Sequence, residues 1–476
     1  MSQTASSPAP TTAPAPPQPF HKVFWYANVT ELFERAAYYS VASFIVIYLG
    51  QLGFGKSLPS SLNGGLWFLV YFLPILSGTI ADLVGFRRAL LVACALLAVG
   101  YFLMGMPTWF LGATLDPVIG DDFTASPAIV LPIILGMFVI GLGGSVVKPC
   151  ISGTVQKTHA GRATLAFAIF YMVINIGSLV GRVVAYFVRS GWNLSYIFAV
   201  GMLASAAAFL SVLLLYRDPD RAPGEKPKRT PKEALAGIPL VLTNGRFVLF
   251  LLVSSGFWFL YNQVYNVLPL YTKRTLETNP AMDLYTAANP LTIVLFQLLI
   301  TRAFGKMKPI RSIVVGTLII CTAMVVNLYP LYAAGGARAL YQNWLPLGSL
   351  FIVLTVALIA FGELFTSSRT FEWIGSLAPK GQEGLFLGYA NLPMAIGSLI
   401  GGPVGAWIFN GVMCRDAKKL ENGLLDLDPS AATQGWLLLM GIGILSALSM
   451  WLYNVWLERQ LKADAAKAVA AAPTAG

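Results

Sequence analysis

Long apolar segments alternate with short breaks that are polar or rich in glycine and proline along most of the sequence. Many of these segments have about 20 residues or more, the length an α-helix needs to cross the roughly 30 Å hydrocarbon core of a bilayer. The pattern therefore predicts an all-α membrane protein. We place twelve spans at residues 23–50, 61–84, 87–107, 126–153, 162–190, 194–217, 246–273, 280–304, 309–333, 342–370, 381–412 and 432–459.

The composition agrees with a chain that lies mostly in lipid. Of 476 residues, 56% are apolar and only 11% are Asp, Glu, Lys or Arg, whereas soluble domains have roughly 25% charged residues. One water-soluble core could not bury so much apolar surface, which excludes an ordinary cytosolic enzyme. The four cysteines are scattered and lack the spacing of a disulfide framework or a metal site. We expect no metal and no cofactor.

One long, charged connection divides the sequence into two parts of similar length. Residues 1–22 are mainly Pro, Ala, Ser and Thr and predict a disordered cytoplasmic tail, not a signal peptide. Residues 23–217 and 246–459 would each form a six-helix bundle, with a cytoplasmic linker at 218–245 and a cytoplasmic tail at 460–476. Two six-span halves joined in this way are typical of a duplicated transporter fold.

The basic residues indicate how the chain is oriented. The net charge of +11 would suggest nucleic acid as the partner of a soluble protein. If both termini are cytoplasmic, however, the inner segments hold 21 Lys and Arg residues and the outer loops hold eight, as the positive-inside rule requires. We therefore expect a multi-pass protein of the inner (plasma) membrane, with the lipid bilayer and not nucleic acid as its partner.

Six ionisable side chains fall inside the predicted spans. A charge at the bilayer centre costs at least about 2.5 kcal/mol, so each is expected to be paired or to line a pathway. In the first span the charged residues share one helix face with Tyr38 and Tyr39, and this face must meet protein or water. An ion pair that only fixes helix packing is the alternative. The three acids and three bases are Glu31, Glu34, Arg35, Lys148, Arg182 and Glu363.

The turn between the second and third spans carries a recognisable motif. Residues 78–88 read Gly-Thr-Ile-Ala-Asp-Leu-Val-Gly-Phe-Arg-Arg, which resembles the cytoplasmic loop motif of the major facilitator superfamily. The resemblance implies the fold of that superfamily, twelve transmembrane helices in two pseudo-symmetric six-helix halves. It also implies that Asp82, Arg87 and Arg88 help to latch the outward-open state.

Several separated segments resemble one family within that superfamily, the proton-dependent oligopeptide transporters. Residues 31–39, Glu-Leu-Phe-Glu-Arg-Ala-Ala-Tyr-Tyr, resemble its first-helix signature E-x-x-E-R-F-x-Y-Y, and Lys148 followed by Pro149 resembles its fourth-helix lysine. Residues 170–178 and 362–367 are similar to its fifth-helix and tenth-helix segments. The matches cover nearly the whole predicted transmembrane body.

The resemblance assigns roles to individual residues. The implied proton-coupling residues are Glu31, Glu34, Arg35 and Lys148. The implied substrate-binding residues are Tyr38, Tyr39, Tyr71, Asn175, Trp258, Asn289, Glu363 and Ser367. Glu363 would face the amino group of a substrate, and the cationic side of the pocket would face its carboxylate.

Four positions depart from the family pattern, the first being Ala36 in place of the usual Phe after the signature arginine. Bacterial peptide carriers of this family often have an arginine where this chain has Ala42, and the seventh-helix glutamate is replaced by Asn262. Arg182 is an additional charge, seven residues after Asn175 and therefore on the same helix face. Arg182 could reach the outer headgroups, or it could replace the missing anion contact and bind substrate.

Together these observations predict a symporter that imports di- and tripeptides, or similar small zwitterionic solutes, with protons by alternating access. A facilitator or anion carrier of the same fold, without full proton coupling, is the alternative. An intramembrane enzyme lacks a separate catalytic set, and a receptor would need a larger soluble domain. We expect a monomer that is not an enzyme.

Overall fold

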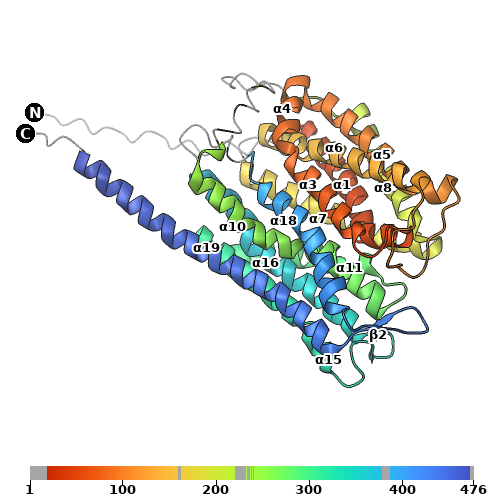
Figure 1. Ribbon diagram of the computed structural model, residues 1–476. Coiled ribbons are helices and arrows are strands. Elements are labelled where there is room, and N and C mark those ends of the chain that lie inside the picture. Colours follow the sequence, from red (N-terminus) through yellow and green to blue (C-terminus); the bar gives the residue numbers. More distant parts are fainter. Residues whose placement is uncertain are drawn as a thin grey trace, which may run out of the picture.

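The structure, a computed structural model, describes residues 19–158, 162–219, 232, 236, 239, 241–377, 386 and 388–471. Two groups of helices lie side by side, one coloured red to yellow and the other green to blue in Figure 1. The predicted tail at 1–22 and linker at 218–245 lie largely outside the described residues.

The first group of helices corresponds to the first six predicted spans. Two of these spans are bent, by 45° between α1 and α2 and by 44° between α3 and α4. Pro74 is the first residue of α4, and a proline inside a span removes one backbone hydrogen bond and bends the helix. The helices are α1 (Lys22–Ala42), α2 (Ile45–Gln51), α3 (Leu58–Phe72), α4 (Pro74–Val84), α5 (Phe86–Phe110), α6 (Pro127–Thr158), α7 (Ala163–Gly191), η1 (Leu194–Tyr196) and α8 (Ile197–Leu214).

The second group corresponds to the last six predicted spans. Two of its spans end in π-helical turns, and two short hairpins join helices at one end of the group. The helices are α10 (Gly245–Asn262), η2 (Gln263–Tyr265), α11 (Val267–Tyr271), η3 (Thr272–Leu276), α12 (Met282–Thr286), α13 (Ala288–Phe304), α14 (Pro309–Val325), α15 (Leu328–Tyr332), α16 (Leu347–Leu377), α18 (Leu392–Trp407), η4 (Ile408–Met413) and α19 (Pro429–Ala471). The antiparallel hairpins pair β1 (Leu340–Tyr341) with β2 (Leu345–Pro346) and β3 (Lys418–Lys419) with β4 (Leu425–Asp426).

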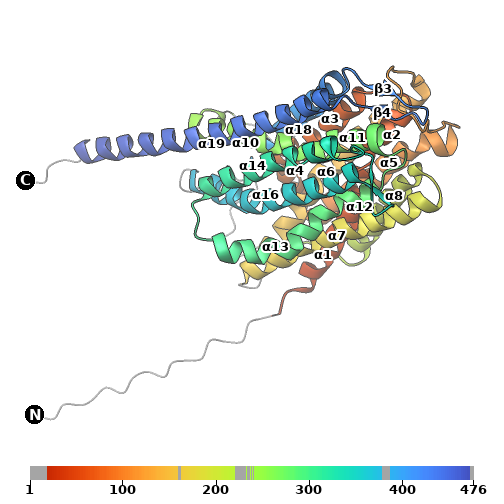
Figure 2. The same ribbon diagram turned by 90° about the horizontal axis from the view of Figure 1, so that it is seen from below.

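The ends of the last two helices bear on two predicted boundaries. We expected the eleventh span to begin at residue 381, which lies outside the described residues; a turn at 388–391 precedes α18, which starts at Leu392 with Pro393 in its first turn. Proline is favoured there because its missing N–H has no helical partner in any case. The last helix continues past the predicted end at 459 to Ala471, since this segment is rich in alanine, the strongest helix former. Figure 2 shows α19 projecting beyond the other helices.

The described helices agree with a multi-pass membrane protein. Ten of them are long and apolar enough to cross a membrane, and the two bent pairs bring the number to as many as twelve. Large apolar side chains, including Leu131, Phe187 and Leu298, are exposed on the protein surface. Such side chains are stable when they face lipid instead of water.

The two groups of helices touch closely where α3 packs against α18. A Cβ atom added to Gly64 would lie 2.5 Å from the carbonyl oxygen of Ser398, and one added to Gly402 would collide with the carbonyl oxygen of Ser60. Small residues allow helix backbones to approach in this way. At this contact, backbone meets backbone directly.

Candidate functional site

A cavity of about 1050 Å³ lies between the two groups of helices. Asp82 on α4, Lys157 on α6 and Phe371 on α16 line it and are also exposed to solvent. We call this the open end of the cavity. The inner wall is rich in aromatic rings, as is common in ligand pockets. They are Tyr39, Trp67, Tyr71, Phe170, Tyr171, Trp258 and Tyr261.

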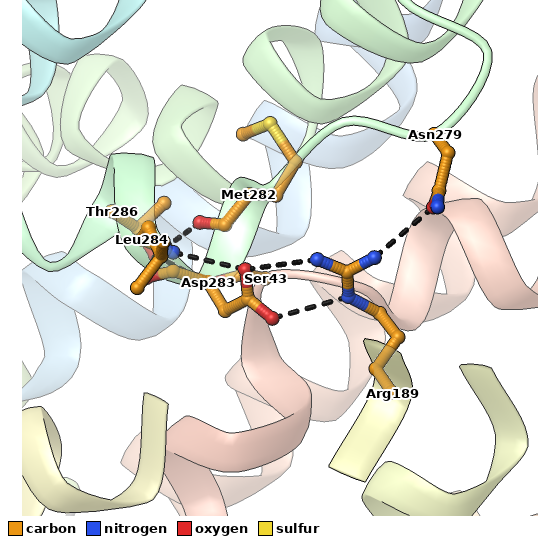
Figure 3. A network of polar contacts seen from close by, with 7 residues as sticks. All are labelled: Ser43, Arg189, Asn279, Met282, Asp283, Leu284 and Thr286. Carbon is orange, nitrogen blue, oxygen red and sulfur yellow. Dashed lines mark hydrogen bonds and ion pairs between the residues drawn. The ribbon is translucent and has the colours of Figure 1, made fainter. Parts of the chain in front are cut away.

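A buried ion pair joins the two halves at the opposite, closed end. Arg189 on α7 donates from Nε to Asp283 Oδ2 at 3.1 Å and from Nη2 to Oδ1 at 3.3 Å. Its Nη1 donates to Asn279 Oδ1 at 3.0 Å. Figure 3 shows the guanidinium between these two partners. Both charged side chains are almost fully buried, at 5% and 1% exposure, so separating them without water would be costly.

A second set of contacts closes the same end nearer the surface. Asp121, in the loop before α6, accepts from Arg274 at 3.0 Å and lies 3.3 Å from the Lys56 ammonium. Burial alone would raise the pKa of this carboxyl, but the two cations outweigh burial and lower its pKa. Asn410 accepts from Arg274 at 2.7 Å and donates to the carbonyl of Lys56 at 3.0 Å. These bonds also join the first half to the second.

Two carboxylates and a guanidinium form a buried cluster on α1. Arg35 donates from Nε to Glu34 Oε2 at 2.5 Å, and its Nε lies 3.5 Å from Glu31 Oε1. Both glutamates are buried, and neither oxygen of Glu31 has a hydrogen-bond partner among the described residues. Arg35 reaches the cavity wall, whereas the glutamates lie behind it. The cluster therefore contains a carboxylate with unused capacity for a proton or a cation.

Lys148 faces this cluster from α6. Its side chain lines the cavity and makes no hydrogen bond or ion pair within the part of the chain that the structure describes. The charges of Arg35, Glu31 and Glu363 all act on it. Lys148 is therefore a cation that a ligand or a rearranged glutamate could engage.

Glu363 on α16 presents a carboxylate to the opposite side of the cavity. Ser367 donates to its Oε1 at 3.3 Å, and Asn289 on α13 donates to its Oε2 at 3.5 Å. Tyr261 also lies within hydrogen-bonding reach. Within the described chain Glu363 forms no ion pair, so its charge is balanced by neutral donors alone. Burial of such a carboxylate is favourable only if a cation, a proton or a ligand arrives.

The structure separates the predicted site residues into two groups. Those that line the cavity are Arg35, Tyr39, Tyr71, Asp82, Lys148, Trp258, Glu363 and Ser367. Those that lie behind its wall are Glu31, Glu34, Tyr38, Asn175, Arg182 and Asn289. Their roles in binding and coupling stay predictions.

The motif at 78–88 covers the last two turns of α4, the connecting residue Gly85 and the start of α5. Gly85 ends α4 with φ +92°, a conformation that favours glycine. Arg87 donates to the carbonyls of Tyr216 at 3.0 Å and Leu213 at 2.8 Å, at the end of α8. Arg88 is exposed. In this state Arg87 therefore holds helices of the first half together, and the latch remains a prediction.

Sequence reasoning missed three residues near the cavity. Tyr261 follows Trp258 by one helical turn, a spacing that could have indicated a shared face. Arg189 lies two turns beyond Arg182 on one face of α7, but it fell at a span end and was counted with the outer loops. Asp283 carried no signal, since its pairing with Arg189 depends on packing between residues 94 positions apart.

Known proteins resemble this chain over most of its length. The sequence profile of the Major Facilitator Superfamily matches residues 29–401. The chain belongs to this superfamily. Its fold is the one predicted from the sequence, twelve transmembrane helices in two six-helix halves. Membership of a superfamily of transporters indicates transport rather than catalysis.

Individual relatives of this transporter are more informative about its branch of the superfamily. It is 24% identical to a dipeptide and tripeptide permease B of Shigella dysenteriae, over 94% of this chain and 97% of the relative. It is 25% identical to the permease of the same name from Salmonella typhimurium, over 84% and 88%.

Solved structures have the same fold. A peptide transporter POT in complex with sulfate matches with a TM-score of 0.70 and 18% identity, over 93% of this chain and 96% of that one. A POT family transporter in complex with 5-aminolevulinic acid matches with 0.67 and 19%, over 90% and 95%. The comparisons confirm the resemblance to the oligopeptide transporter family.

Proposed function

We propose that the protein is a proton-coupled symporter that imports di- and tripeptides by alternating access. The observation that carries this proposal is a cavity closed at one end, with a cation, Lys148, on one wall and a carboxylate, Glu363, on another, neither of which forms an ion pair among the described residues. A zwitterion complements such a pair of charges. Several relatives are named dipeptide and tripeptide permeases. These names support peptides, and not other zwitterions, as the substrate.

The cavity supplies contacts for each part of a short peptide. Glu363, held by Ser367 and Asn289, would accept the terminal amino group. Lys148 and Arg35 would face the carboxylate from the opposite wall. The aromatic rings between them suit side chains of varied shape, because stacking and apolar contacts need no fixed hydrogen-bond pattern.

The α1 cluster would carry the proton. Among the described residues neither carboxylate oxygen of the buried Glu31 has a hydrogen-bond partner, and an ionised carboxylate in that position is costly. Proton binding to Glu31 or Glu34 would remove a negative charge beside Arg35. Arg35 and Lys148 would then both be free to bind a substrate anion. Proton release towards the cytoplasm would reverse this change and weaken substrate binding.

The proposed setting follows from the distribution of basic residues. The protein would lie in the inner membrane with both termini cytoplasmic and would act as a monomer. The open end of the cavity would then face the cytoplasm, and the closed end with Arg189 and Asp283 would face outward. This structure would be an inward-facing state of the transport cycle.

Uptake of radiolabelled dialanine into proteoliposomes tests the proposal. An inwardly directed proton gradient should drive accumulation above equilibrium. Glu31→Gln and Glu34→Gln should abolish that accumulation but leave exchange of labelled for unlabelled peptide measurable. Glu372→Gln, which alters an exposed glutamate on α16, is the matched control and should accumulate normally.

Two outcomes contradict parts of the proposal. Saturable uptake that ignores the pH gradient would indicate a facilitator, for which the missing seventh-helix glutamate at Asn262 would be a reason. Equal loss of accumulation and exchange in Glu31→Gln and Glu34→Gln would show that the cluster is a structural ion pair.

A further inference from the structure

Arg182, in the middle of α7, is a buried cation surrounded by neutral groups. Its side chain is fully buried. Nε donates to the Thr286 hydroxyl at 3.0 Å, Nη2 donates to the Tyr265 hydroxyl at 3.2 Å, and Nη1 donates to the hydroxyl and the carbonyl of Ser178. The guanidinium also lies over the Tyr39 ring, 4.4 Å from its centroid. Among the described residues no carboxylate pairs with it.

The buried charges of the transmembrane region show what Arg182 lacks. Arg35 pairs with Glu31 and Glu34, and Arg189 pairs with Asp283, whereas Lys148, Arg182 and Glu363 form no ion pair within the described chain. Arg182 and Glu363 have opposite charge, and the electrostatic influence of both reaches Tyr39. A buried charge without a counter-charge is unfavourable, so an anion that reached Arg182 would be bound strongly.

The partners of Arg182 come from different halves of the protein. Ser178 and Tyr39 belong to the first half, on α7 and α1. Thr286 and Tyr265 belong to the second half, on α12 and η2. When the closed end opens, the halves separate there, and Arg182 must lose its two partners from the second half. Its guanidinium then faces the newly opened side of the cavity.

We propose that Arg182 binds the terminal carboxylate of the peptide in the outward-facing state and is covered again by Thr286 and Tyr265 when the closed end re-forms. Arg182 thereby acts as a specificity-determining residue for substrate loading. It supplies a guanidinium to a pocket whose first helix has Ala42 where related peptide carriers often have an arginine. The inference rests on the proposed peptide transport.

Arg189 provides a comparison on the same helix. It lies two turns from Arg182 and also contacts α12, but Asp283 already supplies its carboxylate. A substrate carboxylate would therefore meet no unbalanced positive charge at Arg189. Loss of Arg189 should therefore affect acid and amide substrates alike, whereas loss of Arg182 should affect the acid selectively.

Transport measurements in right-side-out and inside-out membrane vesicles test this inference. The vesicles come from cells without other peptide carriers, and the half-saturation constants for dialanine and for its C-terminal amide are compared. From the outer face, Arg182→Gln should raise the constant for dialanine at least about tenfold, as expected for loss of a charged hydrogen bond. The constant for the amide should change less than about twofold. Arg182→Lys should restore part of the difference, and Arg189→Gln should shift both substrates equally.

The inner face and the unmodified protein give independent measurements. Because Arg182 is covered in the inward-facing state, Arg182→Gln should change the inner-face constants for acid and amide by similar, small factors. The unmodified protein should also prefer the acid over the amide more strongly from the outer face than from the inner face. This measurement does not depend on whether a variant folds.

Three results would overturn the inference while leaving peptide transport intact. They are equal effects of Arg182→Gln on acid and amide, equal acid-selective effects at both faces, and the same acid preference of the unmodified protein at both faces. Absence of saturable dialanine uptake by the unmodified protein would instead overturn the proposed function itself.

Discussion

Removing one charge from the Arg189 and Asp283 pair should open the closed end of the cavity. Asp283→Asn keeps the size and most of the hydrogen-bonding capacity of the side chain but removes its charge. Arg189 is then left buried without a carboxylate. When the two halves separate at this end, water reaches the guanidinium, so the substitution has little cost in the outward-facing state. The closed state alone is destabilised.

The size of the effect follows from the burial of the pair. Loss of one partner of a buried ion pair costs about 3–5 kcal/mol. At about 1.4 kcal/mol per tenfold change, the ratio of outward-facing to inward-facing protein should rise roughly 100- to 3,000-fold. Arg189→Gln combined with Asp283→Asn removes both charges, and most of this shift should disappear, because no uncompensated charge remains.

Spin labels on either side of the closed end can measure this shift. Thr114 and Ala334 are exposed in loops of the first and second halves, and cysteines introduced there can carry the labels. Cys94, Cys150 and Cys321 are buried, so only Cys414 needs replacement by serine. Asp283→Asn should move the distance distribution to longer values. An unchanged distribution, or a double variant as open as the single one, would refute the reasoning.

Two further predictions concern the substrate amine and the surface of the closed end. Glu363→Gln should raise the half-saturation constant for a free-amine dipeptide about tenfold or more and that for its N-acetylated form little; an identical rise for both in the same uptake assay would remove the amine assignment. The lowered pKa of Asp121 means that its ion pairs favour the closed state above the usual carboxyl range, near pH 4, and that this contribution is lost as the pH falls through the lowered value. The spin-label distances of Asp121→Asn and the unmodified protein should therefore differ at pH 7, and the difference should shrink as the pH falls below about 4; a difference that does not change with pH would argue against the ion pairs.

Hydropathy alone was sufficient to locate the membrane spans. A span must bury about 20 consecutive apolar residues, and its helix satisfies its own backbone, so local sequence determines where it lies. The bends within the first two spans, at residues 43–44 and 73–74, were not predicted. Pro74 provided a local signal for one of them, whereas no proline marks the other.

The candidate site was predictable only in part, because its residues combine local and long-range information. The shared face of Glu31, Glu34 and Arg35 follows from helical spacing, and the structure shows their contacts. The sequence could not show that Glu31 and Glu34 lie behind the cavity wall. It also could not show that Arg189 meets Asp283, because both depend on how separate helices pack.

The close contact between α3 and α18 has a consequence for how fast the two halves can exchange positions. At Gly64 and Gly402 the opposing backbones touch without interlocking side chains. A movement along this surface needs no rotamer changes and opens no void left by a displaced side chain, so it adds little to the activation barrier. The glycine contact thus adds little to the barrier to exchange, whereas the charged contacts at the closed end govern which state is populated.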